Sequence, residues 1–177
     1  MRYRWATHRR IRYGWITHTW AQAWSGGIAA YEADGFISSD SGYAPTLRGL
    51  GADGTGHVLV ATMPATEQIV GTIMLQTWPY TGPVVAGPDE AEIRALAVRP
   101  GILRMGIGRT LLKHALERAA ELRIRSLVLC TEPAMLVAHR LYEQAGFVRL
   151  PERDWAPSPG TTLLVYGLKL DANAQRT

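Results

Sequence analysis

One segment constrains the fold of this chain more than any other: a strand-like run that leads through a glycine turn into an amphipathic helix. The run ends at Val98, and the glycine turn Gly106-Ile107-Gly108 leads into a helical pattern over residues 107–122. An apolar stripe follows this pattern, formed by Ile107, Leu111, Leu112, Ala115, Leu116, Ala119 and Leu122. Unpaired N–H groups and the helix dipole at such a helix start favour an anion, so the segment predicts a phosphate or pyrophosphate site.

Two common nucleotide-binding motifs do not fit this turn. A P-loop places Lys-Ser or Lys-Thr directly after its last glycine, whereas Ile107 follows Gly106 and Arg109 follows Gly108. A Rossmann fingerprint needs a third glycine three residues after the second, and Leu111 stands there. The anion site therefore belongs to another class of fold.

Three stretches together resemble the GNAT superfamily of acyl-CoA-dependent N-acyltransferases. They are the run from Ala91 to Pro100, the Gly-Ile-Gly turn from Gly106, and the run from Leu141 to Phe147, at the separation that the family uses. The resemblance covers residues 56–170 in element order, and further segments resemble bacterial members of the superfamily. It implies an α/β (α+β) fold with a mixed, mostly antiparallel central sheet. This sheet is splayed after the strand from Ala91 to Val98 and is flanked by helices.

The same resemblance implies acetyl-CoA as the acyl-donor co-substrate. The backbone of Leu96 and Val98 is expected to pair with the pantetheine arm, and the amides from Leu103 to Gly108 are expected to hold the pyrophosphate. Arg104 and Arg109 can add positive charge, although each is also plausible as a surface arginine. The cofactor-binding residues implied in this way are Leu96, Ala97, Val98, Leu103, Arg104, Met105, Gly106, Ile107, Gly108 and Arg109.

Two positions depart from the pattern of the family. Leu103 stands where relatives usually carry Gln or Arg, so phosphate binding there depends on backbone amides and Arg104. Met135 stands where many relatives carry Asn, which removes a polar group near the pantetheine or catalytic end. We expect weaker binding of the cofactor rather than its loss.

Acetyl transfer to an amine requires a group that takes a proton. An alkylammonium with a pKa near 10.4 is free base in only about one molecule in 2,500 at pH 7. Glu92 matches the position of the general base in the histone-acetylating members of the family, and it can act through a water molecule. The alternative is an edge-strand carboxylate paired with Arg94 or Arg123.

The departing CoA thiolate needs a proton donor, and Tyr142 matches the usual general acid of the family. The alternative is an aromatic side chain that packs the helix against the sheet. Phe147 is expected in the core. His139 is expected on another face of the helix and is left out of the site.

Hydrophobic period and turn residues predict the remaining elements. Besides the strand from Ala91 to Val98, the predicted strands are residues 2–12, 57–62, 68–76, 126–130 and 162–170. The predicted helices are residues 15–33 and 107–122, and a third that starts at Pro133, stops at Gly146 and buries Ala134, Ala138, Leu141 and Tyr142. Two loops are expected: residues 78–89, which could cover a site, and a proline-rich loop that contains residues 152–155.

Length and composition favour one N-acetyltransferase domain over residues 1–177, since 177 residues with 47% hydrophobic content suffice for one core. No apolar stretch of membrane-spanning length and no signal-peptide pattern is visible. One cysteine, Cys130, excludes an internal disulfide, and the five histidines lack metal-ligand spacing. We expect a cytoplasmic protein without a metal or a membrane association.

Residues 1–33 form an atypical basic, Trp-rich start. Five arginines and no acid lie in the first 31 residues, so the net charge of +4 comes from this segment and the rest sums to −1. A basic aromatic arm could contact RNA or an acidic partner, but no RNA-binding motif accompanies it, and nucleic acid is an unlikely partner. A cleaved organelle-targeting segment is the remaining alternative.

The leading hypothesis is an acetyltransferase that acts on a small-molecule primary amine by direct attack in a ternary complex. The alternatives are a protein or peptide amine as acceptor, and a non-catalytic acyl-CoA-binding module. Five residues could line a pocket for a cationic acceptor or could equally be turn residues: Asp40, Tyr43, Glu152, Asp154 and Trp155. The sequence leaves open the length of the acyl group and whether the protein is a homodimer.

Overall fold

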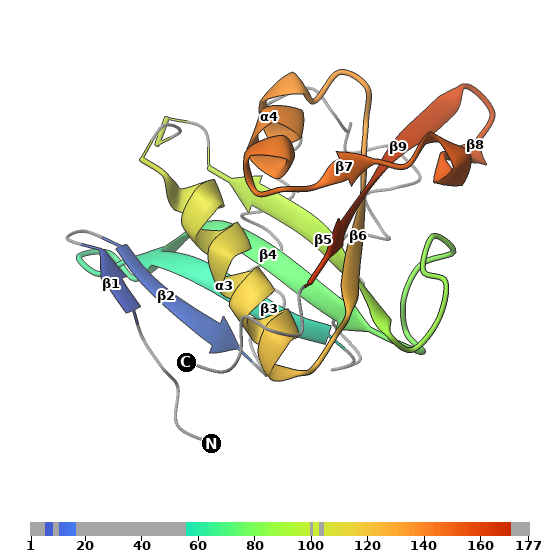
Figure 1. Cartoon of the computed structure of the whole chain (residues 1–177). Helices are drawn as coiled ribbons and strands as arrows, with labels where there is room; N and C mark the ends of the chain where they lie inside the picture. Colours follow the sequence, from blue (N-terminus) through green and yellow to red (C-terminus); the bar gives the residue numbers. More distant parts are fainter. Residues whose placement is uncertain (1–5, 9–10, 17–55, 100, 103–104, 171–177) are drawn as a thin grey trace. The chain divides into compact units, whose positions relative to one another are not determined.

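The computed structural model describes residues 6–8, 11–16, 56–99, 101–102 and 105–170 (Figure 1). Its elements are β1 (Ala6–His8), β2 (Ile11–Ile16), β3 (Gly56–Met63), β4 (Gln68–Thr77), β5 (Glu90–Val98), α3 (Ile107–Glu121), β6 (Ser126–Thr131), α4 (Leu136–Gln144), β7 (Val148–Arg149), η1 (Pro151–Arg153), β8 (Trp155–Ser158) and β9 (Thr161–Lys169). The chain divides into two compact units, Met1–Met74 with Ala95–Ala115 and Leu75–Arg94 with Leu116–Thr177. No helix among the described residues is long and apolar enough to cross a membrane.

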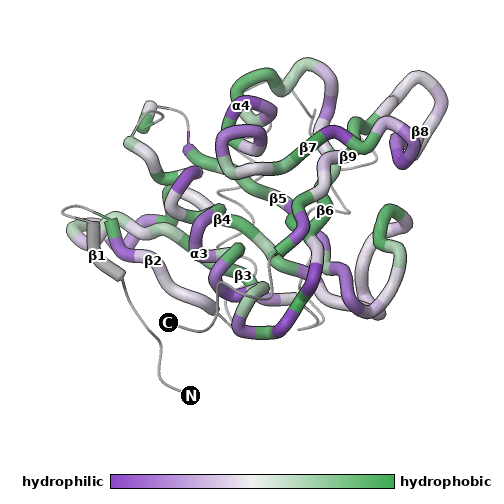
Figure 2. Tube along the Cα trace, in the orientation of Figure 1, coloured by the Kyte–Doolittle hydropathy of each residue, from purple (hydrophilic) through white to green (hydrophobic). Residues whose placement is uncertain are grey.

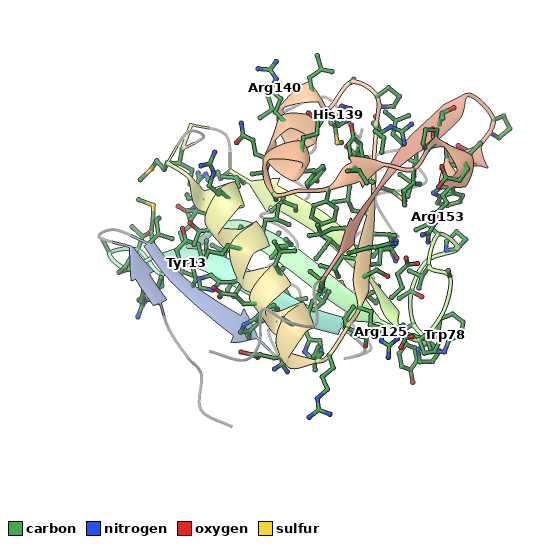
Figure 3. The ribbon with its side chains drawn as sticks, in the orientation of Figure 1. Tyr13, Trp78, Arg125, His139, Arg140 and Arg153 are labelled. Atoms are coloured by element: carbon green, nitrogen blue, oxygen red, sulfur yellow. The ribbon has the colours of Figure 1, made fainter. Side chains whose placement is uncertain are left out.

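The first unit is an antiparallel sheet with the start of α3 packed on it. β1 pairs with β2 in an antiparallel register, and β2 pairs in the same way with β3. Tyr13 on β2 is buried, and its ring lies 5.7 Å from that of His114 on α3 (Figure 3). Hydrophobic and hydrophilic residues alternate around α3 (Figure 2), and its buried members include Ile107 and Leu111. The predicted apolar stripe of this helix is confirmed.

The second unit is built around β6 and β9. β5 and β6 pair in parallel from Glu90↔Ser126 to Ile93↔Leu129. β9 pairs antiparallel with β6, with β7 and with β8. In the described part of the chain, the sheet is mixed and mostly antiparallel and is flanked by the helices α3 and α4, which confirms the predicted fold class.

The register in the second unit assigns side chains to the two faces of its sheet. Partners in register point to the same face, so Ile93, Leu129 and Tyr166 share one face. Tyr142 of α4 packs on this face, with its ring 6.2 Å from that of Tyr166. The neighbouring row, which begins with Glu92, points to the opposite face.

The predicted strand over residues 2–12 is wrong in its bounds, because the segment forms a hairpin of β1 and β2. The helix predicted over residues 15–33 is wrong at its start, since Trp15 and Ile16 belong to β2 and pair with Leu59 and Val58 of β3. β-Branched and aromatic side chains suit this pairing, and the helical period there was poor. The rest of that prediction lies outside the described residues.

Two further expectations are corrected near the second helix. α4 begins at Leu136, not at Pro133, because the N–H of Met135 bonds to the carbonyl of Glu132 and closes a turn instead. Ala134 consequently precedes the helix and is exposed. The expected loop after α4 contains η1 and β8.

Candidate active site

β5 continues beyond its pairing with β6. The parallel register ends at Ile93↔Leu129, whereas β5 runs on to Val98 and β6 to Thr131. Within β5, Ala95 has a φ of 49°, a left-handed conformation that an L residue seldom adopts inside a strand. Such a residue bends the strand and changes its hydrogen bonding, as β-bulges beside functional sites do.

The glycine turn leads directly into the first turn of α3. Gly106 has a φ of 74°, and a Cβ atom at this position would meet no atom of the described residues within 4 Å. Its carbonyl accepts bonds from the N–H and the hydroxyl of Thr110 at 3.0 and 3.1 Å. The first turn of α3 contains no acidic residue. A helix start with a positive-φ glycine before it and no acidic residue in its first turn suits an anion.

The structure gives the predicted cofactor residues different environments. On β5, Ala97 is buried, while Leu96 and Val98 are half-buried. Ile107 is buried in the core, so only its backbone can face a ligand. Met105 is 49% exposed. Of the others, Gly106 and Arg109 are exposed and Gly108 is half-buried. Leu103 and Arg104 lie outside the described residues.

Sequence analysis missed Gly71, which lets the start of α3 approach the sheet closely. A Cβ atom on this glycine of β4 would lie 3.0 Å from Leu111 Cδ1, 3.1 Å from Ile107 Cγ2 and 3.2 Å from the carbonyl oxygen of Ala97. A glycine inside a strand often marks such an approach of another backbone, and this signal was available in the sequence. Gly71 therefore fixes the position of the helix start.

Glu92 is buried and engaged. Its side chain is 6% exposed, Oε2 accepts the N–H of Gly82 at 2.7 Å, and Oε1 lies 3.7 Å from Nε of Arg94. Arg94 also donates to Oε1 of Gln76 at 3.4 Å. Of the partners expected from the sequence, Arg94 is the one found. The bond to Gly82 attaches the loop before β5 to the strand.

Glu90, two residues earlier on β5, holds the other side of that loop. Its carboxylate accepts the N–H of Ala86 at 2.7 Å and two bonds from Arg153 at 2.6 and 3.0 Å. Figure 3 labels Arg153. Arg153 also donates to the carbonyl of Val84. Burial raises the pKa of Glu90, but the bonds from Arg153 and Ala86 outweigh it, and the net pKa is lowered. Sequence analysis missed this ion pair, which joins residues 63 positions apart.

Tyr142 lies in an aromatic cluster on the α4 face of the sheet. Its ring is 6.1 Å from that of Phe147 and 6.2 Å from that of Tyr166. Burial raises the pKa of Tyr142, so the phenol stays protonated at neutral pH and can donate. Phe147 is 2% exposed, which confirms its expected place in the core.

The expectation for His139 was wrong. Its ring lies 5.5 Å from that of Tyr166, so it belongs to the cluster that contains Tyr142. Its Nε2 is 3.0 Å from the carbonyl oxygen of Glu132. His139 and Tyr142 are three positions apart, and residues at this spacing share one face of a helix. Arg140, by contrast, points outward from α4 (Figure 3).

Of the residues considered for a cationic acceptor pocket, Glu152, Asp154 and Trp155 lie in and directly after η1, and the carboxylate of Asp154 is already paired. Asp154 accepts two bonds from Arg149, at 2.8 and 2.7 Å, and the N–H of Val165 at 2.8 Å. These bonds fix the corner between η1 and β9. Asp40 and Tyr43 lie outside the described residues.

A family model described as the Acetyltransferase (GNAT) family matches residues 18–147. No curated protein matches the chain. Solved structures match it over most of its length, among them an acetyltransferase of the GNAT family from Staphylococcus aureus Mu50. That structure is 19% identical, with a TM-score of 0.69, over 90% of this chain and 99% of the other.

Two more of these structures carry names that bear on ligands. A GNAT family acetyltransferase from Elizabethkingia anophelis, with acetyl-CoA bound, is 19% identical, with a TM-score of 0.64 over 92% of this chain and 100% of the other. A ribosomal-protein-alanine N-acetyltransferase from Brucella melitensis is 21% identical, with a TM-score of 0.61 over 88% and 99%.

The fold and the family match define an acyltransferase. The chain belongs to the GNAT acetyltransferase family, whose members transfer an acetyl group to an amine.

Proposed function

We propose that this acetyltransferase moves the acetyl group of acetyl-CoA to the primary amine of a small molecule, by direct attack in a ternary complex. The observation that carries the proposal is the position of Glu92. Its buried carboxylate lies one register pair before the end of the β5–β6 pairing. A basic group thus lies next to the point where β5 stops pairing with β6 and its backbone N–H and C=O groups can bind a ligand instead.

The second half of β5 and the glycine turn are assigned to the cofactor. Leu96, Ala97 and Val98 supply backbone groups to the pantetheine arm, and the amides from Leu103 to Gly108 hold the pyrophosphate. Arg104 and Arg109 add charge. The positive φ of Gly106 and the acid-free first turn of α3 support this assignment.

Glu92 is assigned as the general base. Its Oε2 is committed to the N–H of Gly82, whereas Oε1 lies 3.7 Å from Arg94, beyond a normal hydrogen bond. Oε1 therefore takes the proton of the acceptor ammonium, directly or through a water molecule. The freed amine attacks the thioester carbonyl, its nitrogen forms the amide bond, and the carbon–sulfur bond breaks. The nitrogen loses a second proton to solvent, and solvent restores the proton that the departing thiolate takes from Tyr142.

Tyr142 is assigned as the proton donor to the departing CoA thiolate. It remains a neutral phenol because of its burial, and its contacts with Phe147 and Tyr166 fix its ring. Glu92 points to one face of the second unit's sheet and Tyr142 packs on the other, so in this assignment the two groups act on the thioester from different sides. One group serves the acceptor and the other serves the leaving group.

A protein amine is the second candidate acceptor. It is favoured by one observation, the similarity in fold to a protein named ribosomal-protein-alanine N-acetyltransferase. Cytoplasmic location and a single domain over residues 1–177 remain predictions.

The experiment is acetyl-CoA-dependent release of free thiol, measured across polyamines, amino acids, aminoglycosides, arylalkylamines and short peptides. Release with a small amine and not with peptides is the expected result. Release with peptides alone would replace the small molecule by a protein acceptor. Silence across the panel while acetyl-CoA still raises the melting temperature would contradict the proposed transfer.

A further inference from the structure

We infer that the acceptor is a compact, apolar monoamine, and that its non-reacting part occupies a cavity of about 270 Å³ in the second unit; this inference rests on the proposed function. The cavity is lined by Pro83, Val84, Val85, Ala86, Arg153 and Trp155. Four of these residues belong to the loop before β5, and two follow α4. Among them, Trp155 is also one of the residues that the sequence suggested for an acceptor pocket.

The cavity lies on the face of the sheet to which Glu92 points. Val128 is in register with Glu92, and it packs in one cluster with Val84, Val85 and Val165. Gly82, whose N–H bonds to Glu92, directly precedes the first lining residue. The loop that forms one wall of the cavity is therefore held by the proposed base itself.

The charges at the cavity are already matched. Arg153 is the charged residue of the lining, and its guanidinium is neutralised by Glu90 through bonds of 2.6 and 3.0 Å. Glu90 is consequently not free to hold a second ammonium group, and Arg153 is not free to hold a carboxylate. A charged substituent on the acceptor would lose its hydration here without gaining a partner.

The remaining walls are apolar apart from one weak polar contact. The indole N–H of Trp155 is buried beside the thiol of Cys130, a poor acceptor, and makes no bond of normal geometry to the described residues. Because this N–H has almost no accessible surface, it is not open to a molecule in the cavity. The walls thus favour an aliphatic or aromatic body.

The volume of the cavity favours a small-molecule acceptor over a peptide or protein. Pockets for drug-sized ligands measure roughly 300–1,000 Å³, and this cavity of about 270 Å³ falls just below that range. It accommodates one small aromatic or branched aliphatic group. Aminoglycosides are too large and too highly charged, and linear polyamines carry a second cation.

The test compares 2-phenylethylamine with 1,4-diaminobutane and with phenylalanine, which adds a carboxylate to the same aromatic amine. We expect kcat/KM for 2-phenylethylamine to exceed both of the others at least tenfold. The variant Ala86→Trp places an indole at the exposed rim of the cavity. It should raise KM for 2-phenylethylamine at least tenfold and leave acetyl-CoA binding unchanged.

Val148→Trp adds the same side chain at a 62% exposed position of β7 and should leave KM unchanged. Ala86→Leu, a milder change, should raise KM less than Ala86→Trp. Equal or better use of the diamine, or a KM indifferent to both changes at Ala86, would overturn this inference and leave the proposed function standing. Failure to acetylate any amine would overturn both.

Discussion

The glycine turn before α3 and the start of β5 differ in how they are built. At the turn, backbone conformation dominates: Gly106 adopts a positive φ, and Gly71 lets the helix approach β4. At the start of β5, buried charged side chains dominate, with Glu90 bound to Arg153 and Glu92 bound to the N–H of Gly82. In the proposed function, the first region binds the phosphates of the cofactor, and the second selects the amine.

Because they are built differently, the two regions should respond differently to substitution. A change at the turn should weaken binding of the cofactor, because amide directions carry that binding. A change at the start of β5 should affect turnover or the choice of acceptor while the cofactor still binds. Five substitutions test this separation.

Glu92→Gln should have the largest effect. The amide can still accept the N–H of Gly82 but cannot take a proton, so kcat should fall by about 10²–10⁴. Steady-state kinetics measures the fall in kcat, and titration with acetyl-CoA measures the affinity for the cofactor, which should not change. Glu121→Gln, at an exposed carboxylate of α3, is the control. If Glu92→Gln keeps the native kcat, Glu92 is not the general base.

Tyr142→Phe should lower kcat by about 10², at the lower end of the range for a general acid, since a thiol with a pKa near 8.5 leaves more readily than an alcohol. The ring contacts with Phe147 and Tyr166 are preserved. Stopped assays at several pH values measure the loss, with Tyr80→Phe at an exposed position as the control. Equal rates for the two variants would leave Tyr142 as a packing residue only.

Gly106→Ala should weaken acetyl-CoA binding about tenfold. An L residue at a φ of 74° costs about 1–2 kcal/mol, and the new methyl group enters the open space before α3. Gly160→Ala carries a similar penalty at a φ of 81°, also in open space, and should not change the affinity. Isothermal titration calorimetry with acetyl-CoA measures the affinity of both variants. Equal affinities would refute the pyrophosphate site at Gly106.

Gly71→Ala should destabilise the protein by about 1–3 kcal/mol through overpacking and weaken acetyl-CoA binding a few-fold by shifting the start of α3. Urea unfolding and titration provide the two readings. Gly87→Ala, where a Cβ meets no atom within 4 Å, is the matched control. A stable variant with unchanged affinity would show that the close approach at Gly71 has no functional role.

The smallest effect should be seen in the dependence of stability on pH. The pKa of Glu90 is lowered in the folded state, so its contribution is present above the unfolded value of about 4.3 and is lost as pH falls through the folded value. Between pH 6 and pH 3, the free energy of unfolding should fall more steeply for the native protein than for Glu90→Gln. Parallel pH profiles in urea would contradict this.

The parts of the molecule that sequence predicts well are local. The strand to Val98, the turn at Gly106 and α3 follow each other within one short segment, so period and glycine spacing suffice to predict them. The bonds from Arg153 to Glu90 and from Gly82 to Glu92 depend on tertiary packing and leave no periodic signal. Trp15 was predicted as helix but lies in β2, because pairing of this strand with β3 outweighs the local helical pattern.

The attachment of the loop before β5 has a consequence for how this enzyme could diversify. The loop is attached at Gly82 and at Ala86 to the two carboxylates of one strand. Between these points Pro83 is exposed and can change without disturbing either attachment, whereas Val84 and Val85 pack against Val128 and Val165 and tolerate only apolar exchanges of similar size. Exchanging this short segment between homologues, or randomising it in a library, should yield enzymes that prefer other amines and still use the same acyl donor.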